Sequence, residues 1–146
     1  MTPERNRSGS TRKDRGDEPD TDALLMSRIS NEMVQAQKKY FGRGPTQAKS
    51  YMLDDFLLVV MRGGMTTAER TMLGFGRQDL VRSFRQELEN ELAESVIDTM
   101  QTLTGRTIVN REAQILFDPH IVIEMFFFET EGAAAGAAGE DPAPEK

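Results

Sequence analysis

The sequence predicts an α+β domain of two layers, in the order helix, strand, strand, helix, strand, strand, in which two helices cover one face of a four-stranded antiparallel sheet. Apolar residues recur at helical spacing over two long segments, residues 21–41 and 78–103. A pair of short apolar segments follows each predicted helix, and the turn inside each pair begins with aspartate. The two halves are also weakly similar in sequence, which favours one continuous sheet.

In the first half, the helix over residues 21–41 precedes strands over residues 48–53 and 56–61. Asp54 and Asp55 form the turn between these strands, because aspartate tolerates turn geometry and hydrogen-bonds its own backbone. The second strand, FLLVVM, is apolar on both faces, which is typical of a central strand covered on both sides or of a strand at an interface. The helix is predicted to bury one stripe: Leu25, Ile29, Met33, Ala36 and Tyr40.

In the second half, a long helix over residues 78–103 precedes strands over residues 107–117 and 121–129. Residues 118–120, Asp-Pro-His, form the turn between these two strands. The long helix is predicted to bury one apolar stripe: Leu80, Phe84, Leu88, Leu92, Val96 or Ile97, Met100 and Leu103.

The stretch between the halves, MRGGMTTAERTMLGFGR, is superficially similar to a glycine-rich phosphate-binding loop. It is not a Walker A motif, because no Gly-Lys-Ser/Thr follows the glycines, and it lacks the third glycine of a dinucleotide-binding motif. Thr66 and Glu69 instead fit a capping box, in which Thr66 caps a short helix over residues 68–73. The glycines then mark the end of a strand and the break before the long helix.

The folded part of the chain is predicted to be a single α+β domain over residues 21–130. Residues 1–20 are strongly charged and almost without apolar side chains, so we expect a disordered charged arm. Residues 131–146 form an acidic segment rich in alanine and glycine, and we expect a disordered tail there.

The composition of the chain argues against several classes of function. The net charge of −6 makes nucleic-acid binding unlikely, because affinity for nucleic acid comes mainly from lysine and arginine at phosphates. The chain has no cysteine, which removes disulfides, thiolate metal sites and thiol catalysis. No apolar run is long enough to span a bilayer, and no secretory signal is present, so we expect a cytoplasmic protein that reaches a membrane only through a partner.

Catalytic chemistry has few candidate side chains. His120 is the only histidine, so neither a zinc site nor a relay of histidine with cysteine can be assembled, and we expect His120 to be structural or exposed. The pair Asp54 and Asp55 is read as a turn. We therefore expect a protein that is not an enzyme, without catalytic residues, cofactor or metal.

Charge is segregated along the long helix. Five arginines lie between residues 62 and 85, whereas residues 86–98 contain acids and no base, an order that opposes the helix macrodipole. Three explanations are open: a solvated charged face, antiparallel packing of this helix against that of a second copy, or an anion bound at a helix start. The candidate residues for a partner or anion contact are Arg62, Thr66, Thr67, Arg70, Arg77, Arg82 and Arg85.

Self-association is also predicted. If two helices cover one face of the sheet, the apolar segments FLLVVM and EMFFF expose side chains on the other face. Monomeric proteins seldom expose apolar surface on that scale, so we expect a homodimer.

Residues 24–130 resemble a bacterial family of small proteins, the MpsC type, named after a Na⁺-translocating system that generates membrane potential. The similarity is strongest at residues 42–46, 53–56, 62–70 and 104–106. The resemblance implies an accessory component linked to a membrane ion or bicarbonate transport system. It brings no catalytic motif and therefore assigns no catalytic residue. The alternative function is a regulatory domain that senses a small anion at the arginine-rich junction between strand and helix.

Overall fold

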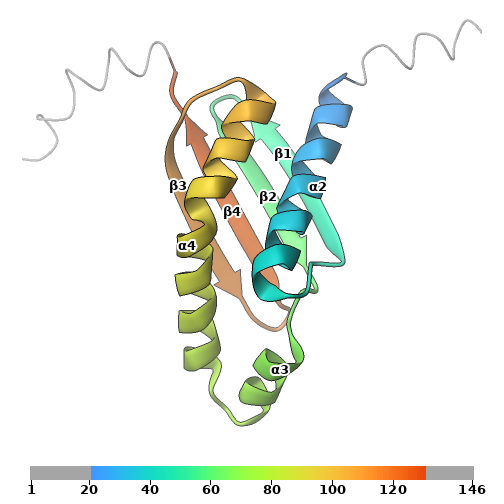
Figure 1. The fold of residues 1–146 in the computed structure, drawn as a ribbon, viewed down its shortest axis with the longest axis vertical. Helices are drawn as coiled ribbons and strands as arrows, with labels where there is room; N and C mark the ends of the chain where they lie inside the picture. The colour runs from blue at the N-terminus through green and yellow to red at the C-terminus, as the bar shows by residue number, and fades with distance from the viewer. Residues whose placement is uncertain (1–20, 131–146) are drawn as a thin grey trace, which may run out of the picture.

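The computed structural model describes residues 21–130 as three helices and a four-stranded antiparallel sheet (Figure 1). The predictions of a disordered arm over residues 1–20 and a disordered tail over residues 131–146 lie outside the described residues. In chain order the elements are α2 (Thr21–Phe41), β1 (Gln47–Leu53), β2 (Phe56–Arg62), α3 (Thr67–Gly74), α4 (Gln78–Thr104), β3 (Ile108–Leu116) and β4 (Ile121–Phe128).

The predicted fold class is confirmed. Each predicted helix and strand is present, and the ends differ from the prediction by no more than one residue. Local signals explain this agreement: Gly42 follows α2 with a positive φ of 82°, and Gly105 follows α4 with a φ of 71°. Glycine adopts this left-handed conformation without steric cost, so both helices end where the sequence places a glycine.

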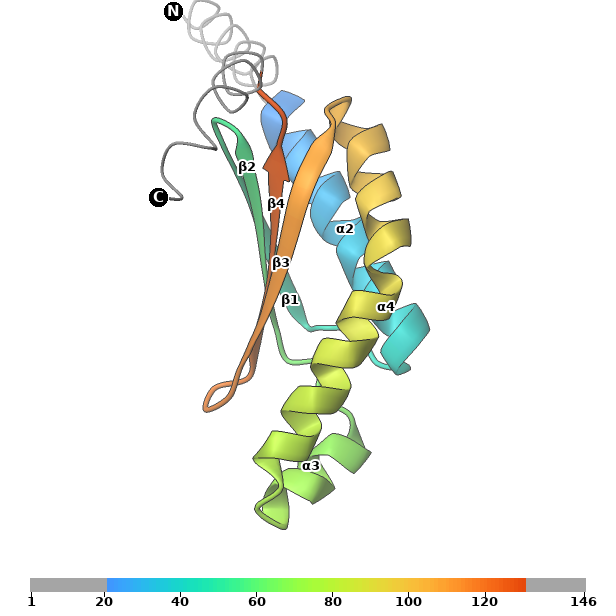
Figure 2. The same cartoon turned by 90° about the vertical axis from the view of Figure 1, so that its left-hand side faces the viewer.

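The sheet has the order β1-β2-β4-β3, which puts β2 and β4 in the centre. All three pairings are antiparallel, and Val59 of β2 lies opposite Ser50 of β1 and Glu124 of β4. Helices α2 and α4 lie on the same side of this sheet (Figure 2). The structure is therefore a layer of helices on a layer of strands, as the sequence predicts.

The hydrophobic core lies between these two layers. Alternate residues of β2 and β4 point toward the helices, because successive side chains of a strand lie on opposite faces. Helical residues at spacings of three and four complete the core. Its fully buried members include Leu57, Val59, Val122 and Phe126 from the strands and Ile29, Met33, Leu92, Val96 and Met100 from the helices.

The first half of α4 differs from the prediction. It extends past the end of the sheet, with α3 beside it (Figures 1 and 2). The buried residues there are Val81, Arg85 and Glu89, whereas Leu80 and Phe84 are exposed, so the stripe predicted from Leu80 and Phe84 is wrong in this half. The buried face is offset by one residue because it contains the charged side chains of Arg85 and Glu89. A pattern of apolar spacing does not detect buried charged residues.

The face of the sheet that points away from α2 and α4 is not covered by any part of residues 21–130. We call it the uncovered sheet face. Its two central strands present apolar side chains that are only partly buried: Phe56, Leu58 and Val60 on β2, and Ile121, Ile123, Met125 and Phe127 on β4. This arrangement matches the exposure expected from the sequence.

Candidate functional site

The glycine-rich stretch between β2 and α4 contains the capping box that the sequence predicts. The Thr66 hydroxyl accepts a hydrogen bond from the Glu69 backbone amide at 3.2 Å, and the Thr66 amide donates to Glu69 Oε1 at 2.9 Å. These two bonds satisfy backbone donors that the start of α3 would otherwise leave unpaired. The pattern therefore fixes where α3 begins and also orients the Glu69 carboxylate.

That carboxylate lies in a buried ion pair with Arg85 of α4. The Arg85 Nε donates to Glu69 Oε2 at 2.6 Å, and Nη2 donates to Oε1 at 2.8 Å and to the Gly64 carbonyl at 2.9 Å. Arg85 is 2% exposed. Burial alone would raise the pKa of Glu69, but hydrogen bonds from Arg85 and from the Thr66 amide outweigh it and hold that pKa below its ordinary value.

The structure therefore brings Thr66 and Arg85 together, but around an internal anion. The Glu69 carboxylate occupies the position at this helix start where an external anion was one of the expected alternatives. Arg85 also stacks on an aromatic ring, with its guanidinium carbon 3.9 Å from the centroid of Phe41. A side chain held in this way is internal to the fold and presents no surface to a partner.

Arg82 is also engaged within the fold, although it is exposed. Its Nη1 donates to the Ile115 carbonyl near the end of β3, and its guanidinium carbon lies 5.0 Å from the centroid of the Phe117 ring. Arg82 thus ties α4 to the hairpin between β3 and β4. Arg82 and Arg85 lie near the start of α4, where the helix macrodipole disfavours them, because each has partners in other parts of the fold.

The other predicted contact residues lie at separate places on the surface. Arg62 ends β2, and the alternation of that strand assigns it to the uncovered sheet face. Thr67 and Arg70 are exposed on α3. Arg77 is exposed at the start of α4 and pairs with Asp79 at 3.5 Å. The seven residues predicted as one site therefore do not form one cluster, and Arg70 and Arg77 are the arginines that stay exposed near α3.

A groove beside α3 was not predicted from the sequence. Its volume is about 530 Å³, within the range of about 300–1,000 Å³ that is typical of binding pockets. We call it the α3 groove. The residues that line it come from the end of α2, from α3 and from the start of α4: Tyr40, Phe41, Thr66, Ala68, Glu69, Met72, Leu80, Val81 and Phe84.

The walls of the α3 groove are mainly apolar and aromatic. Phe84 is 53% exposed and Leu80 is 44% exposed, so these two members of the predicted stripe line the groove instead of the core. The ring of Phe41 meets the ring of Phe84 edge to face, with centroids 6.4 Å apart, and it also contacts the Arg85 guanidinium. The buried ion pair therefore contacts the lining of the groove at Phe41.

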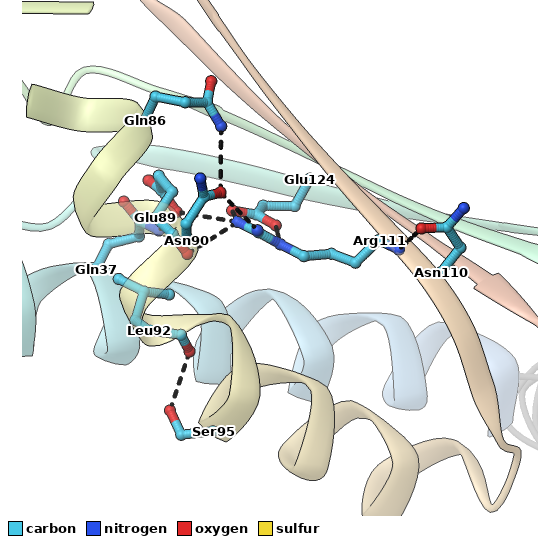
Figure 3. A network of polar contacts seen from close by, with 9 residues as sticks. All are labelled: Gln37, Gln86, Glu89, Asn90, Leu92, Ser95, Asn110, Arg111 and Glu124. Carbon is cyan, nitrogen blue, oxygen red and sulfur yellow. Dashed lines mark hydrogen bonds and ion pairs between the residues drawn. The ribbon is translucent and has the colours of Figure 1, made fainter. Parts of the chain in front are cut away.

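A second buried polar network lies deeper, between α4 and the sheet (Figure 3). Arg111 of β3 holds Glu124 of β4 through two hydrogen bonds of 2.9 Å, and it donates to the Glu89 backbone carbonyl at 3.0 Å. Gln37 of α2 donates to Glu89 Oε1 at 3.0 Å. Both carboxylates are fully buried, although Glu89 belongs to the run of acids over residues 86–98 for which a solvated face was one of the alternatives.

Two carboxyl groups thus share one guanidinium inside the core. Burial raises the pKa of Glu124 well above its ordinary value, and a hydrogen bond with Glu89 raises it further, against the opposing effect of Arg111. A hydrogen bond between two carboxyl groups needs a proton on one of them. The raised pKa favours the protonated form of Glu124. Glu89 Oε2 has no hydrogen-bond partner among the described residues.

Neither network is a metal site within the described residues. Within residues 21–130 there is no group of three or more histidine, cysteine, aspartate or glutamate side chains placed to hold a metal ion. His120 is partly buried, and burial lowers its pKa, followed by the positive charge of Arg85, so the neutral form is favoured. Glu89 and Glu124 are both sealed from solvent.

The described helices also have no membrane-spanning candidate, since none is both long and apolar enough to cross a bilayer. No solved structure matches the chain. Among curated proteins, the uncharacterized protein YbcI of Bacillus subtilis (strain 168) is 31% identical over 85 residues, which is 58% of this chain and 68% of YbcI. A family profile described as "Na+-translocating membrane potential-generating system (MpsC)" matches residues 21–130. The chain therefore belongs to the MpsC family.

Proposed function

We propose that this protein is a non-enzymatic accessory component of a membrane-potential-generating system, which moves an ion or bicarbonate, and that it acts in the cytoplasm through protein contacts. The observation that carries the proposal is the α3 groove, an apolar, partly aromatic hollow on a chain of the MpsC family. Exposed aromatic side chains around a concave apolar surface are the usual anchor points of a protein partner.

The charges around the groove indicate the chemistry of the partner. Lys39, Arg70 and Arg77 are exposed on the three segments that border it, and the acid Asp79 is paired with Arg77. The segments that form the groove therefore carry exposed basic side chains in addition to its apolar walls. We propose that the groove receives an amphipathic segment of a membrane-embedded transport subunit, with apolar side chains in the groove and acidic side chains at its rim.

The anion-sensing alternative has less support. An external anion at the start of α3 would have to displace the Glu69 carboxylate, which already accepts hydrogen bonds from Arg85 and from the Thr66 amide. If bicarbonate or phosphate at millimolar concentration raised the melting temperature of the chain, that alternative would regain support, because a ligand that binds the folded state stabilises it.

Capture from detergent-solubilised membranes tests the proposal. The full chain is immobilised, and bound proteins are identified by mass spectrometry. We expect an ion-transporting membrane protein to bind wild type, to be lost with Phe84→Glu, and to bind more weakly when Arg70 and Arg77 are both replaced by glutamate. Leu24→Glu is the matched control, because Leu24 is an exposed apolar residue at the opposite end of α2 from Tyr40.

A cellular measurement complements the capture. In cells that lack the gene, a potential-sensitive dye should report a lower membrane potential, which the wild-type chain and Leu24→Glu restore and Phe84→Glu does not. Equal capture by wild type and Phe84→Glu would show that the α3 groove is not the contact surface. An unchanged membrane potential in cells without the gene would contradict the accessory role itself.

A further inference from the structure

The uncovered sheet face lies on the side of the sheet opposite to α2 and α4 (Figure 2). The strand register places its side chains in rows that run across β1, β2, β4 and β3. One row holds Lys49, Val60, Ile123 and Gln114. The array therefore has two apolar columns in the centre and one mixed column at each edge.

The centre of this surface has the character of an interface. Seven of the eight central side chains are apolar, Arg62 being the exception at one end. Phe56 and Phe127 pack together with ring centroids 4.9 Å apart. Tyr51, Leu53 and Leu116 extend the apolar surface onto the edge strands and are each at least 40% exposed. A continuous apolar patch that spans a sheet marks a protein-binding surface in most folded domains.

The two edges carry opposite charge. On β1 the charged member of the edge column is Lys49, and on β3 it is Glu112, and both side chains are exposed. These residues lie one row apart, because Lys49 is aligned with Gln114 and Glu112 with Tyr51. One copy of the chain therefore has an apolar centre, a positive edge and a negative edge on the same face.

We propose that a second copy of this chain covers the uncovered sheet face, with a two-fold axis that runs approximately along the strands. Such an axis places β1 of one copy over β3 of the other, so the edge with Lys49 meets the edge with Glu112 twice in the dimer. The two apolar centres then pack against each other, as in sandwiches of two aligned sheets.

The other simple two-fold axis, perpendicular to the strands, would place each edge over its own copy. Lys49 would then lie near Lys49 of the second copy, and Glu112 near Glu112. Like charges at an interface oppose association, whereas complementary charges fix the orientation of the partners. The charge pattern thus selects the first axis. The α3 groove lies on the helical side, so this dimer leaves it open, and the dimer does not depend on the function proposed for that groove.

Sedimentation velocity of the full chain tests the dimer. We expect wild type to sediment as a dimer at micromolar concentration. Ile123→Glu places a charge in the centre of the interface, so we expect the dissociation constant to rise about 100-fold or more, because a buried charge without a partner is costly. Leu24→Glu is the matched control, since it adds the same charge at an exposed apolar position of α2, in the helical layer, and should leave the dissociation constant unchanged. Circular dichroism checks that both variants stay folded.

A charge reversal tests the orientation. Lys49→Glu and Glu112→Lys should each raise the dissociation constant about 3- to 30-fold, since each breaks two exposed ion pairs in the dimer. The double variant should return to within about threefold of wild type, because the pairs reform with reversed sign. A monomeric wild type, or a dimer that Ile123→Glu leaves intact, would overturn the proposal. A double variant weaker than both single variants would overturn the axis along the strands.

Discussion

The Arg85 guanidinium of α4 holds the Glu69 carboxylate of α3 through two hydrogen bonds, of 2.6 Å and 2.8 Å, with both side chains buried. The same guanidinium reaches the Gly64 carbonyl in the segment that enters α3. One arginine therefore joins three consecutive parts of the chain, and these are the parts that shape the α3 groove. Since the groove lies beyond the sheet, this ion pair holds α3 against α4 there, whereas the hydrophobic core holds the helices against the sheet elsewhere.

Arg85→Met should lower the free energy of unfolding by about 3–5 kcal/mol, because it leaves the buried Glu69 carboxylate without its cation. Chemical denaturation of the full chain measures this change. Arg77→Met is the matched control. Its ion pair with Asp79 is exposed, so the loss should be under about 1 kcal/mol.

The double variant Arg85→Met with Glu69→Gln separates the pair from its surroundings. It removes both charges, so it should be less destabilised than the sum of the two single variants. Losses that simply add would show that the two side chains do not stabilise the fold as a pair.

Gly63→Ala should destabilise the connection between β2 and α3. Gly63 has a φ of 71°, and a Cβ atom there would lie 2.4 Å from the Thr46 hydroxyl oxygen. The strained backbone costs about 1–2 kcal/mol, and the close contact adds to it. Gly74→Ala is the control, because a Cβ at the end of α3 meets nothing within 4 Å and alanine favours a helix. Thermal unfolding should give a lower melting temperature for Gly63→Ala and an unchanged or higher one for Gly74→Ala.

Arg111→Met should destabilise the protein by about 3–5 kcal/mol, since it leaves two buried carboxyl groups without a cation. Arg28→Met, at an exposed position on α2, should change the stability by less than about 0.5 kcal/mol. Urea denaturation of both variants gives the comparison. A small effect of Arg111→Met would mean that both carboxyl groups can be protonated in the core at little cost.

The elements of the fold could be predicted from the sequence because their signals are local. Apolar spacing, the capping box at Thr66 and the glycine after each long helix act within one or two turns of chain. The candidate site could not be predicted in the same way. Whether Arg85 meets a partner protein or the Glu69 carboxylate depends on how α3 folds back on α4, and 16 residues separate the pair along the chain.

The burial of Glu89 could not be predicted from the sequence either. Glu89 lies in a run of acids that is regular enough to suggest a solvated helix face, yet it is fully buried while its neighbours Glu87 and Glu91 are exposed. The residues that explain this burial are Gln37 of α2 and Arg111 of β3, both distant in sequence. A partial signal existed: Glu124 interrupts the apolar strand β4, and a charge inside a central strand calls for a buried partner.

Glu124 should make the stability of the protein depend on pH in a direction opposite to that of Glu69. The pKa of Glu124 is raised in the folded state, so folding binds a proton. Its contribution to stability is complete below the pKa of the unfolded chain and is lost as the pH rises toward the folded pKa. The pKa of Glu69 is lowered, so its contribution is present above the unfolded pKa and is lost as the pH falls toward the folded pKa.

Glu124→Gln separates these two effects. The glutamine amide can donate to Glu89 and accept from Arg111 without a titrating proton, so this variant should lose the decline in stability on the alkaline side and keep the decline in acid that Glu69 causes. Urea denaturation across a series of pH values measures both curves. Glu94→Gln, at an exposed position of α4, is the control and should follow the wild-type curve. If wild type and Glu124→Gln lost stability equally as the pH rises, the raised pKa of Glu124 would not be the cause of that loss.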